Sequence, residues 1–302
     1  MSERYPAIAL VSASAARNLD EDQPPLEHAL RDAGAQVHIV DWDDPSVDWQ
    51  AFDVAVLRST WDYATRVDEF RAWLLYASAR TRLINPPDVV RWNIDKHYLQ
   101  DLAAAGAPII PAVFVEPGQD ARAGVARALA IAIAKSDEMV VKPAVGAGSK
   151  DAQRHARGQE QAMRAHVQRL IDAGRSAMLQ PYLPSVDERG ETSLLFYTGT
   201  FSHAIRKGPM LQSGQEQEPG LVVKEDITPR IPTDAELRVA ERVVAAMPFE
   251  QPLYARVDLL MNDDGAPALL ELELTEPSMF FAHAPGSAAR FAQAIMAASR
   301  RR

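Results

Sequence analysis

Residues 254–274 read YARVDLLMNDDGAPALLELEL, and this stretch decides the fold. Strict alternation of apolar and charged residues in 269–274 predicts a strand with Glu271 and Glu273 on one face. The preceding segment, 253–261, predicts a second strand that places Arg256 and Asp258 on a common face. An Asp-Asp-Gly turn at 263–265 joins the two as a hairpin. The hairpin should therefore bring Asp258 close to Glu271 and Glu273.

Three carboxylates that converge between strands have two interpretations. For residues 269–274 alone, the solvated face of a half-exposed sheet is the simpler one. The hairpin partner changes this, because several carboxylates in one place repel each other unless a cation lies between them. Hard oxygen ligands of this kind suit Mg²⁺, which usually completes its shell with water and nucleotide phosphates. The sequence therefore predicts a magnesium site at Asp258, Glu271 and Glu273.

The first ninety residues alternate strands with helices, which predicts a parallel sheet with helical cover. The expected strands are 8–12, 37–40 and 54–57, and the expected helices are 25–33 and 67–79. Ligands of such sheets bind beyond the carboxyl ends of the strands. Four polar residues follow the strand 54–57 at such an end and are predicted substrate contacts: Arg58, Ser59, Thr60 and Asp62. A capped turn packed by Trp61 is an equally good interpretation.

The rest of the chain predicts mixed α and β structure. All five tryptophans lie in the first third of the chain, which supports a boundary near Pro86-Pro87. We expect three units, 1–88, 89–182 and 183–302, in an α/β protein whose C-terminal part is α+β. Residues 208–220 are polar and rich in turn formers, which predicts a mobile loop. The expected helices are 93–105, 121–134, 160–172, 234–246 and 287–298, and the further strands are 109–115, 139–143, 177–180, 192–197 and 201–206.

Lys142 ends a run of β-forming residues and precedes a loop that contains Gly146, Gly148 and Ser149. Glycines allow backbone N–H groups to approach phosphate oxygens, and a lysine on a strand supplies a fixed charge. Taken alone, a solvated lysine at a strand end is the simpler interpretation. The common nucleotide signatures are absent from the sequence: there is no complete G-x-G-x-x-G, no P-loop and no protein-kinase catalytic loop.

Composition excludes several classes of function. The chain has 302 residues and a formal net charge of −9, with no long basic run, so a nucleic-acid partner is disfavoured. It has no cysteine, which excludes disulfides and thiolate chemistry. No stretch approaches the length of a membrane span or of a secretory signal. We expect a cytoplasmic protein with no membrane partner; the sequence leaves the oligomeric state open, a homodimer included.

The order of these features resembles the ATP-grasp superfamily, near the glutathione synthetase and D-alanine–D-alanine ligase branch. The series consists of Lys96, Lys142 before its glycine loop, Gln180-Pro-Tyr-Leu183, Gly190-Glu191, Arg206, Asp258 and Glu271-x-Glu273. The resemblance covers residue 90 to the end, and the preceding residues are similar to a pre-ATP-grasp domain. It implies an ATP-dependent enzyme that activates a small, amino-acid-like carboxylate as an acyl phosphate.

The resemblance also implies roles for single residues. Lys96 and Lys142 would hold the α- and β-phosphates, the segment with Gln180, Tyr182 and Leu183 would face adenine, and Glu191 would bind the ribose. Asp258, Glu271 and Glu273 would hold two Mg²⁺ ions, with Mn²⁺ as an alternative, and many relatives have Asn at the position of Glu273. Arg206 and Arg256 would steady the transferring phosphoryl group.

A closer resemblance rests on Arg58-Ser-Thr-Trp-Asp-Tyr63, Asp41-Trp-Asp-Asp-Pro45 and Leu272-Glu-Leu-Thr-Glu-Pro-Ser278. These segments are similar to the D-cycloserine-forming ligases, which cyclise O-ureido-D-serine. The resemblance implies that reaction here. Two alternatives stay open: an intermolecular ligase that joins a carboxylate to a separate amine, and a nucleotide-binding protein without catalysis.

Overall fold

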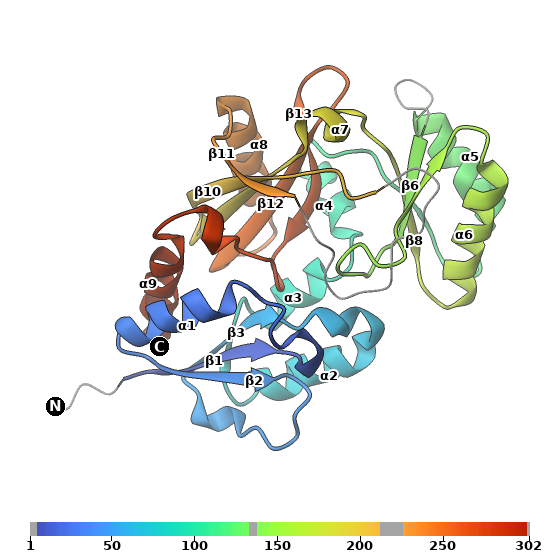
Figure 1. The fold of residues 1–302 in the computed structure, drawn as a ribbon. Helices are drawn as coiled ribbons and strands as arrows, with labels where there is room; N and C mark the ends of the chain where they lie inside the picture. Colours follow the sequence, from blue (N-terminus) through green and yellow to red (C-terminus); the bar gives the residue numbers. More distant parts are fainter. Residues whose placement is uncertain (1–4, 133–137, 212–225, 301–302) are drawn as a thin grey trace.

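The computed structural model describes residues 5–132, 138–211 and 226–300. Its strands form three sheets (Figure 1). The four-stranded parallel sheet of the N-terminal region lies at one end of the molecule. The five-stranded sheet lies in the middle of the view, and a second four-stranded sheet stands beside it with two helices on its outer side (Figure 1).

The N-terminal sheet consists of β1 (Ala7–Ser12), β2 (Gln36–Asp41), β3 (Val54–Ser59) and β4 (Arg82–Ile84). All its pairings are parallel, in the order β2-β1-β3-β4, as the alternation of strands and helices predicted. Every residue of β1 and β3 is buried, because helices cover both faces of the sheet. Helix α1 (Gln23–Asp32) covers one face together with the C-terminal helix α9 (Ser287–Arg300), and α2 (Val67–Ser78) covers the other.

The second four-stranded sheet is antiparallel and contains β5 (Val113–Val115), β6 (Glu138–Pro143), β7 (Gln153–Ala156) and β8 (Ala177–Pro181). Its order is β5-β8-β6-β7. Helices α5 (Ala121–Ala132) and α6 (Glu160–Asp172) pack on one face through an apolar cluster. Because side chains alternate along β6, Lys142 points to the other face of the sheet, toward the cavity.

The five-stranded sheet is antiparallel, in the order β11-β10-β9-β12-β13. Its strands are β9 (Glu191–Tyr197), β10 (Thr200–Lys207), β11 (Ile227–Arg230), β12 (Tyr254–Met261) and β13 (Pro267–Glu273). The hairpin predicted from residues 254–274 is confirmed: β12 and β13 pair antiparallel, with Asp258 opposite Glu271 and Arg256 opposite Glu273. Helix α8 (Asp234–Ala245) packs on one face of this sheet with α4 (Tyr98–Ala104).

The helix predicted at 93–105 exists only in its second half, and its predicted start is wrong. Helix α3 (Pro87–Asn93) ends before residue 94, and α4 starts at Tyr98. The break has a physical cause: the Asn93 side chain bonds the backbone of Leu272 (2.7 Å) and Leu274 (2.7 Å), and the Lys96 N–H donates to Ala144 O (2.9 Å). These tertiary bonds replace helical ones and leave Lys96 on the tight turn between the two helices.

The predicted strand 109–115 is shorter in the structure, because Ile110 N donates to Leu269 O (2.9 Å) and only residues 113–115 join β8. The elements that the sequence did not predict are short: α3, β4, β7, β11, α7 (Ser185–Arg189) and the 3₁₀ turns Ser14–Ala16, Trp49–Ala51, Trp61–Thr65 and Phe281–His283. Most of the predicted loop 208–220, and the end of the predicted helix 121–134, lie outside the described residues.

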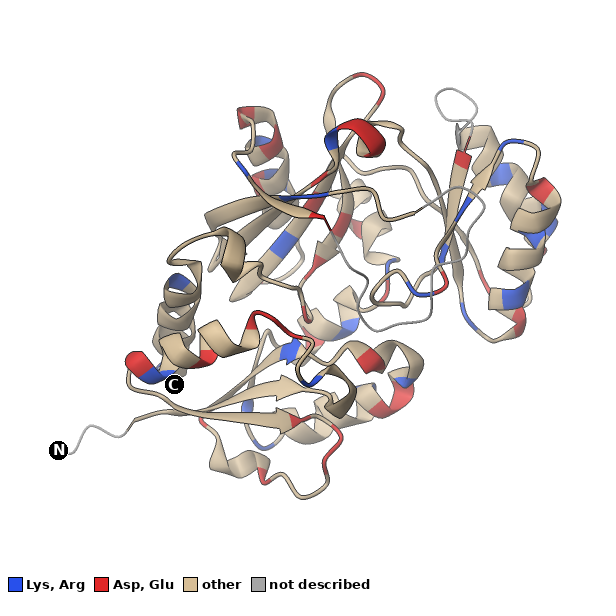
Figure 2. Cartoon of the chain, in the orientation of Figure 1, with Lys and Arg blue, Asp and Glu red and all other residues tan. Residues whose placement is uncertain are grey.

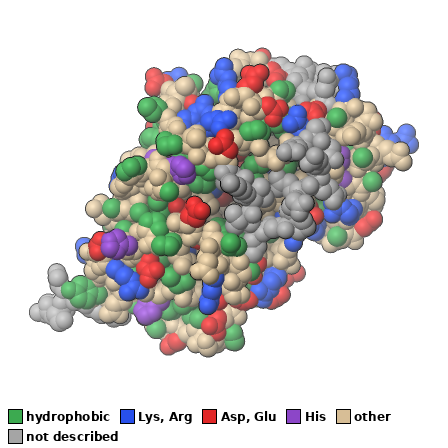
Figure 3. Space-filling view, viewed as in Figure 1, with side chains coloured by type: hydrophobic (Ala, Val, Ile, Leu, Met, Phe, Trp, Pro, Cys, Tyr) green, Lys and Arg blue, Asp and Glu red, His purple; other side chains and the backbone are tan. Residues whose placement is uncertain are grey.

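The described surface has mixed charge. On the face in Figure 3, outside the grey area, Lys and Arg side chains are interspersed with Asp and Glu side chains and form no single basic area. Among the described helices, none has the length and apolarity needed to cross a membrane.

Candidate active site

A cavity of about 540 Å³ lies where the three sheets approach each other. Its wall includes residues from the N-terminal region, from the loop after β6 and from one face of β12 and β13. Most residues that the sequence predicted for a nucleotide and metal site contribute to this wall. They are Lys96, Lys142, Gly146, Gly148, Ser149, Gln180, Tyr182, Leu183, Glu191, Arg256, Asp258, Glu271 and Glu273.

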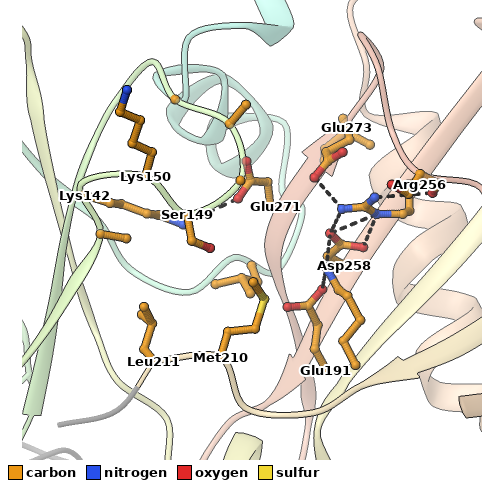
Figure 4. A pocket seen from close by; sticks show the side chains of 18 of the residues that line it. Lys142, Ser149, Lys150, Glu191, Met210, Leu211, Arg256, Asp258, Glu271 and Glu273 are labelled. Atoms are coloured by element: carbon orange, nitrogen blue, oxygen red, sulfur yellow. Dashed lines mark hydrogen bonds and ion pairs between the residues drawn. The ribbon is translucent and has the colours of Figure 1, made fainter. Parts of the chain in front are cut away.

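Glu271 occupies the centre of a lysine pair. Lys96 Nζ lies 3.0 Å from Glu271 Oε1, and Lys142 Nζ lies 3.5 Å from Glu271 Oε2 (Figure 4 shows the second pair). Burial opposes ionisation of Glu271, but the two lysines outweigh it and lower the pKa of that carboxyl. Burial also lowers the pKa of Lys142, and Glu271 counteracts this. One carboxylate thus holds two lysines, from distant segments, beside the cavity.

A second charged group forms around Arg256 and Asp258. Arg256 Nη2 lies 2.9 Å from Asp258 Oδ2 and also contacts Glu273, which faces Arg256 across the hairpin (Figure 4). Both Arg256 and Asp258 are almost fully buried. Burial raises the pKa of Glu273, and Arg256 opposes that effect. The alternation of β12 and β13 therefore places all four charged side chains on the cavity side, as the sequence predicted.

Lys207 is a cavity residue that the sequence analysis did not identify. Its Nζ lies 3.3 Å from Asp258 Oδ2 and contacts Glu191, and the side chain is buried. The neighbouring Arg206, predicted as catalytic, does not belong to the cavity wall formed by the described residues. Its guanidinium donates to Arg189 O (3.0 Å) and pairs with Asp226 (3.1 Å), because successive residues of a strand point to opposite faces.

One part of the cavity wall is apolar. It is lined by Val140, Leu183, Leu260 and Leu270. Beside it, Tyr182 donates its hydroxyl hydrogen bond to Asp187 (2.5 Å) and stacks with the guanidinium of Arg154, whose centre lies 3.5 Å from the ring centroid. Gln180 uses its side-chain amide on Ile110 O (3.3 Å). The residues at 180–183 are thus fixed by side-chain contacts, and their segment borders the apolar wall.

The predicted substrate contacts, in the last two residues of β3 and just after it, lie behind the wall rather than in it. Arg58 is fully buried and donates to Pro277 O (3.1 Å), and the Ser59 hydroxyl lies 2.9 Å from that of Ser12. Thr60 is fully buried as well, and Asp62 accepts from Trp42 Nε1 (2.8 Å). Among the described residues of this segment, Trp61 and Tyr63 reach the cavity. The segment therefore supports the wall through two aromatic side chains.

Glu276 is a further residue that the sequence analysis missed, although it lies within the quoted segment 272–278. It lines the cavity and is nearly buried. Burial first, and the charge of Glu273 next, raise the pKa of Glu276 to about 8, so this carboxyl is mostly protonated at neutral pH. Its signal in the sequence, a lone glutamate after a strand, is too common to indicate a site.

In the described part of the chain, no three His, Asp or Glu side chains lie together as a ready metal site. The reason is visible in the contacts above: each predicted metal ligand is engaged by a lysine or arginine. The three carboxylates nevertheless share one cavity and one sheet face, so they remain the residues that could hold a hard cation.

Comparison with solved structures defines the class of fold. The chain matches the ATP-grasp ligase PsnB, in a complex with its minimal precursor, Mg and ADP, with a TM-score of 0.63 over 97% of this chain and 98% of that one, at 16% identity. It also matches D-alanine–D-alanine ligase from Bacillus anthracis, complexed with ATP, with a TM-score of 0.66 over 97% of each chain, at 15% identity. The fold is therefore the ATP-grasp fold.

A much nearer likeness identifies the family. The chain is 43% identical to the cycloserine biosynthesis protein DcsG of Streptomyces lavendulae over 95% of this chain and 97% of that protein. The crystal structure of D-cycloserine synthetase DcsG matches with a TM-score of 0.90 over 97% of this chain and 100% of that one, at 41% identity. Residues 8–85 match the model of the DcsG N-terminal domain. The chain belongs to the DcsG family of ATP-grasp enzymes and is an ATP-dependent ligase.

Proposed function

We propose that this ligase phosphorylates the carboxylate of O-ureido-D-serine with ATP and then closes the D-cycloserine ring. One oxygen of the carboxylate attacks the γ-phosphorus, which yields an acyl phosphate and ADP. The substituted ureido nitrogen attacks the acyl carbon, forms the ring C–N bond and expels phosphate. Hydrolysis of the carbamoyl group then releases carbon dioxide and ammonia. The likeness to D-cycloserine synthetase over nearly the whole chain supports this substrate.

The observation that carries the proposal is the charged lining of one cavity. Lys96, Lys142, Lys207 and Arg256 supply four positive charges, and each is balanced by an acidic neighbour, in the set Glu191, Asp258, Glu271 and Glu273. Phosphoryl transfer depends mainly on positioning and on neutralising phosphate charge, and fixed cations in a buried cavity meet both needs. We propose that Lys96 and Lys142 bind the α- and β-phosphates.

We assign the other nucleotide contacts to the 180–183 segment, to Glu191 and to the glycine loop. Backbone groups of the 180–183 segment would bind adenine beside the apolar surface, and Glu191 would bind the ribose hydroxyls. The loop with Gly146, Gly148 and Ser149 would cover the phosphates and exclude water, which hydrolyses acyl phosphates. We propose that Lys207 and Arg256 contact the transferring phosphoryl group, with Lys207 in the role expected of Arg206, because Lys207 faces the cavity.

The carboxylates of Asp258, Glu271 and Glu273 fit magnesium. They are hard oxygen donors on one face of a hairpin, and the metal would offset their mutual repulsion. Mg²⁺ held there would neutralise charge on the phosphate oxygens, and the lysines that now bind Glu271 would be free for phosphate. We propose two ions, with Mn²⁺ as a substitute, and unit boundaries near residues 88 and 182.

The test is ADP release with ATP, Mg²⁺ and O-ureido-D-serine as the sole organic acid, followed by mass spectrometry of the products. We expect ADP, phosphate and D-cycloserine in equal amounts. Asp263→Ala, on the exposed turn of the same hairpin, is a control that should retain full activity. ADP release that requires a separate amine would replace cyclisation with intermolecular ligation. No release with any carboxylic acid would reject the proposed function.

A further inference from the structure

Two acidic residues before α1 have different environments although they lie only two positions apart. The carboxylate of Asp22 is fully used: Oδ2 accepts from the N–H groups of Met279 (2.6 Å) and Phe280 (3.0 Å), and Oδ1 accepts from that of Phe281 (2.8 Å). Phe280 has a φ of 54°, a left-handed conformation that an aromatic residue rarely adopts. Asp22 thus has a structural role: it holds an unfavourable turn against the N-terminal sheet.

Asp20 has no comparable role. Its Oδ1 accepts from the N–H of Asp22 (3.0 Å), and Oδ2 has no hydrogen bond of normal geometry in the described part of the chain. The Ser59 hydroxyl is near enough to lower the pKa of Asp20, but it is already engaged with Ser12 (2.9 Å). The residue is only 7% exposed, and it lines the cavity. A buried carboxylate oxygen without a donor costs free energy that folding does not recover. Such an oxygen at a cavity wall is explained if a ligand supplies the donor.

The charges around Asp20 indicate what kind of donor is needed. Asp20 and Asp22 carry two negative charges, and the buried Arg58, whose Nη2 lies 4.0 Å from Asp22 Oδ2, supplies one positive charge. Two buried carboxyl groups thus share one neighbouring cation, and a ligand that carries a positive charge would be favoured beside Asp20. Burial raises the pKa of Asp20, Arg58 lowers it and Asp22 raises it again, so an additional cation would favour the ionised carboxylate.

Asp20 and Arg256 both line the cavity. Arg256 Nη1 donates to Ser278 O (3.3 Å), and its guanidinium lies 5.5 Å from the centroid of the Phe280 ring. The bonds from Asp22 to residues 279–281 bring the 19–22 segment beside this turn, and Figure 2 shows the acidic segment before α1 facing the five-stranded sheet. An α-amino acid carries its ammonium and carboxylate on one carbon, so a carboxylate near Arg256 places the ammonium along this wall.

We propose that Asp20 Oδ2 binds the primary ammonium group of the substrate and thereby selects α-amino acids over other carboxylic acids. This inference rests on the proposed function, because it assumes that the carboxylate of the same molecule is activated at Arg256. A single anionic oxygen suits an ammonium donor, whereas a metal ion would require several oxygen ligands.

The test compares two acids that differ only in the amino group: O-ureido-D-serine and 3-(ureidooxy)propanoic acid. We expect Asp20→Asn to lower kcat/KM for the amino acid by about 10- to 100-fold, the usual effect of losing a charged hydrogen bond. For the acid without the amino group, the same variant should stay within about threefold of the wild type. The KM for ATP should not change. Asp32→Asn, an exposed position at the end of α1, is the matched control.

Two further measurements distinguish a failure of the proposed ammonium subsite from poor folding of a variant and from a failure of the proposed function. Wild-type protein alone should prefer the amino acid by a factor similar to the loss in Asp20→Asn, which tests the subsite even if the variant folds poorly. Asp22→Asn should instead lower Tm and reduce turnover of both acids together. Equal losses for both acids in Asp20→Asn, or no preference in the wild type, would overturn the subsite alone. A wild-type protein that releases no ADP with any acid would reject the proposed function itself.

Discussion

Two charged segments lie near the cavity, and they have opposite relations to it. On the β12–β13 hairpin, Arg256, Asp258, Glu271 and Glu273 all line the wall. At the end of β3, Arg58, Ser59 and the following Thr60 are fully buried behind it. Both segments read as polar residues on or after apolar strands. They differ in what decides the direction of a side chain: regular alternation along paired strands in the first case, and a register shift at the end of β3 in the second.

The difference shows which sequence patterns allow the direction of a side chain to be predicted. Along a paired strand, side chains alternate, so residues 256 and 258 must share a face with 271 and 273 once the hairpin register is known. Near the end of β3 this alternation is interrupted, because the register with β1 shifts at Arg58. There the packing of Arg58 against the C-terminal region decides, and its partner, Pro277, lies more than two hundred positions away in the sequence.

The largest effect expected on the hairpin side is from Glu271→Ala. It removes the carboxylate that lies between Lys96 and Lys142 and that we assign to the metal site. We expect kcat to fall by about 1000-fold, because charge stabilisation of the phosphoryl group depends on this position. Lys142→Ala should chiefly raise the Kd for ATP instead. Steady-state ADP release and calorimetry of ATP binding provide the two readouts. Unchanged turnover in Glu271→Ala would refute the metal assignment.

On the β3 side we expect an effect on folding rather than on binding. Arg58→Met leaves Asp22 and Pro277 O without their cation and donor in a buried region, and should lower the free energy of unfolding by about 3 kcal/mol. Urea unfolding measures it, with the exposed Arg71→Met as the control. If Arg58→Met had unchanged stability and a strongly raised KM for the acid, Arg58 would be a substrate-binding residue, as the sequence predicted.

Neighbours on β10 provide a sharper version of the same comparison. Lys207 faces Asp258 and Glu191, while Arg206 faces Arg189 and Asp226. Lys207→Met should lower kcat/KM by about 100-fold, a loss typical of one buried charged contact to the reacting group. Arg206→Met should change it by no more than about threefold. Steady-state kinetics with the two variants in parallel decide the matter, and the reverse order of effects would favour Arg206 as the catalytic residue.

The sequence predicted much of the fold and most of the cavity wall, for identifiable reasons. The parallel N-terminal sheet and the hairpin followed from periodicity, and helix 160–172 was predicted with the bounds that α6 has. The break before Lys96 could not be predicted, because it depends on bonds from Asn93 to β13. Lys207 was missed because Arg206 and Lys207 are adjacent and both positively charged, and the sequence does not show which of them faces the cavity. Asp20 and Glu276 depend on burial, which only the packed structure determines.

The smallest effect we predict concerns Glu276 in the absence of nucleotide and metal. Its ordinary pKa is 4.5, and in the folded protein the pKa is raised to about 8, mainly by burial. Between these values the unfolded chain loses the proton that the folded protein keeps, so this residue makes stability fall as pH rises from 4.5 to 8.

Glu276→Gln keeps the shape without the ionisation, so its Tm advantage over wild type should be least near pH 5 and greatest above pH 8. We expect a gain of about 1 kcal/mol at pH 8, less than the whole shift because solvent and Lys96 can relax toward the charge. Thermal melts of both proteins from pH 5 to 9 measure the difference, and a Tm difference that does not vary with pH would mean that Glu276 ionises normally in the cavity.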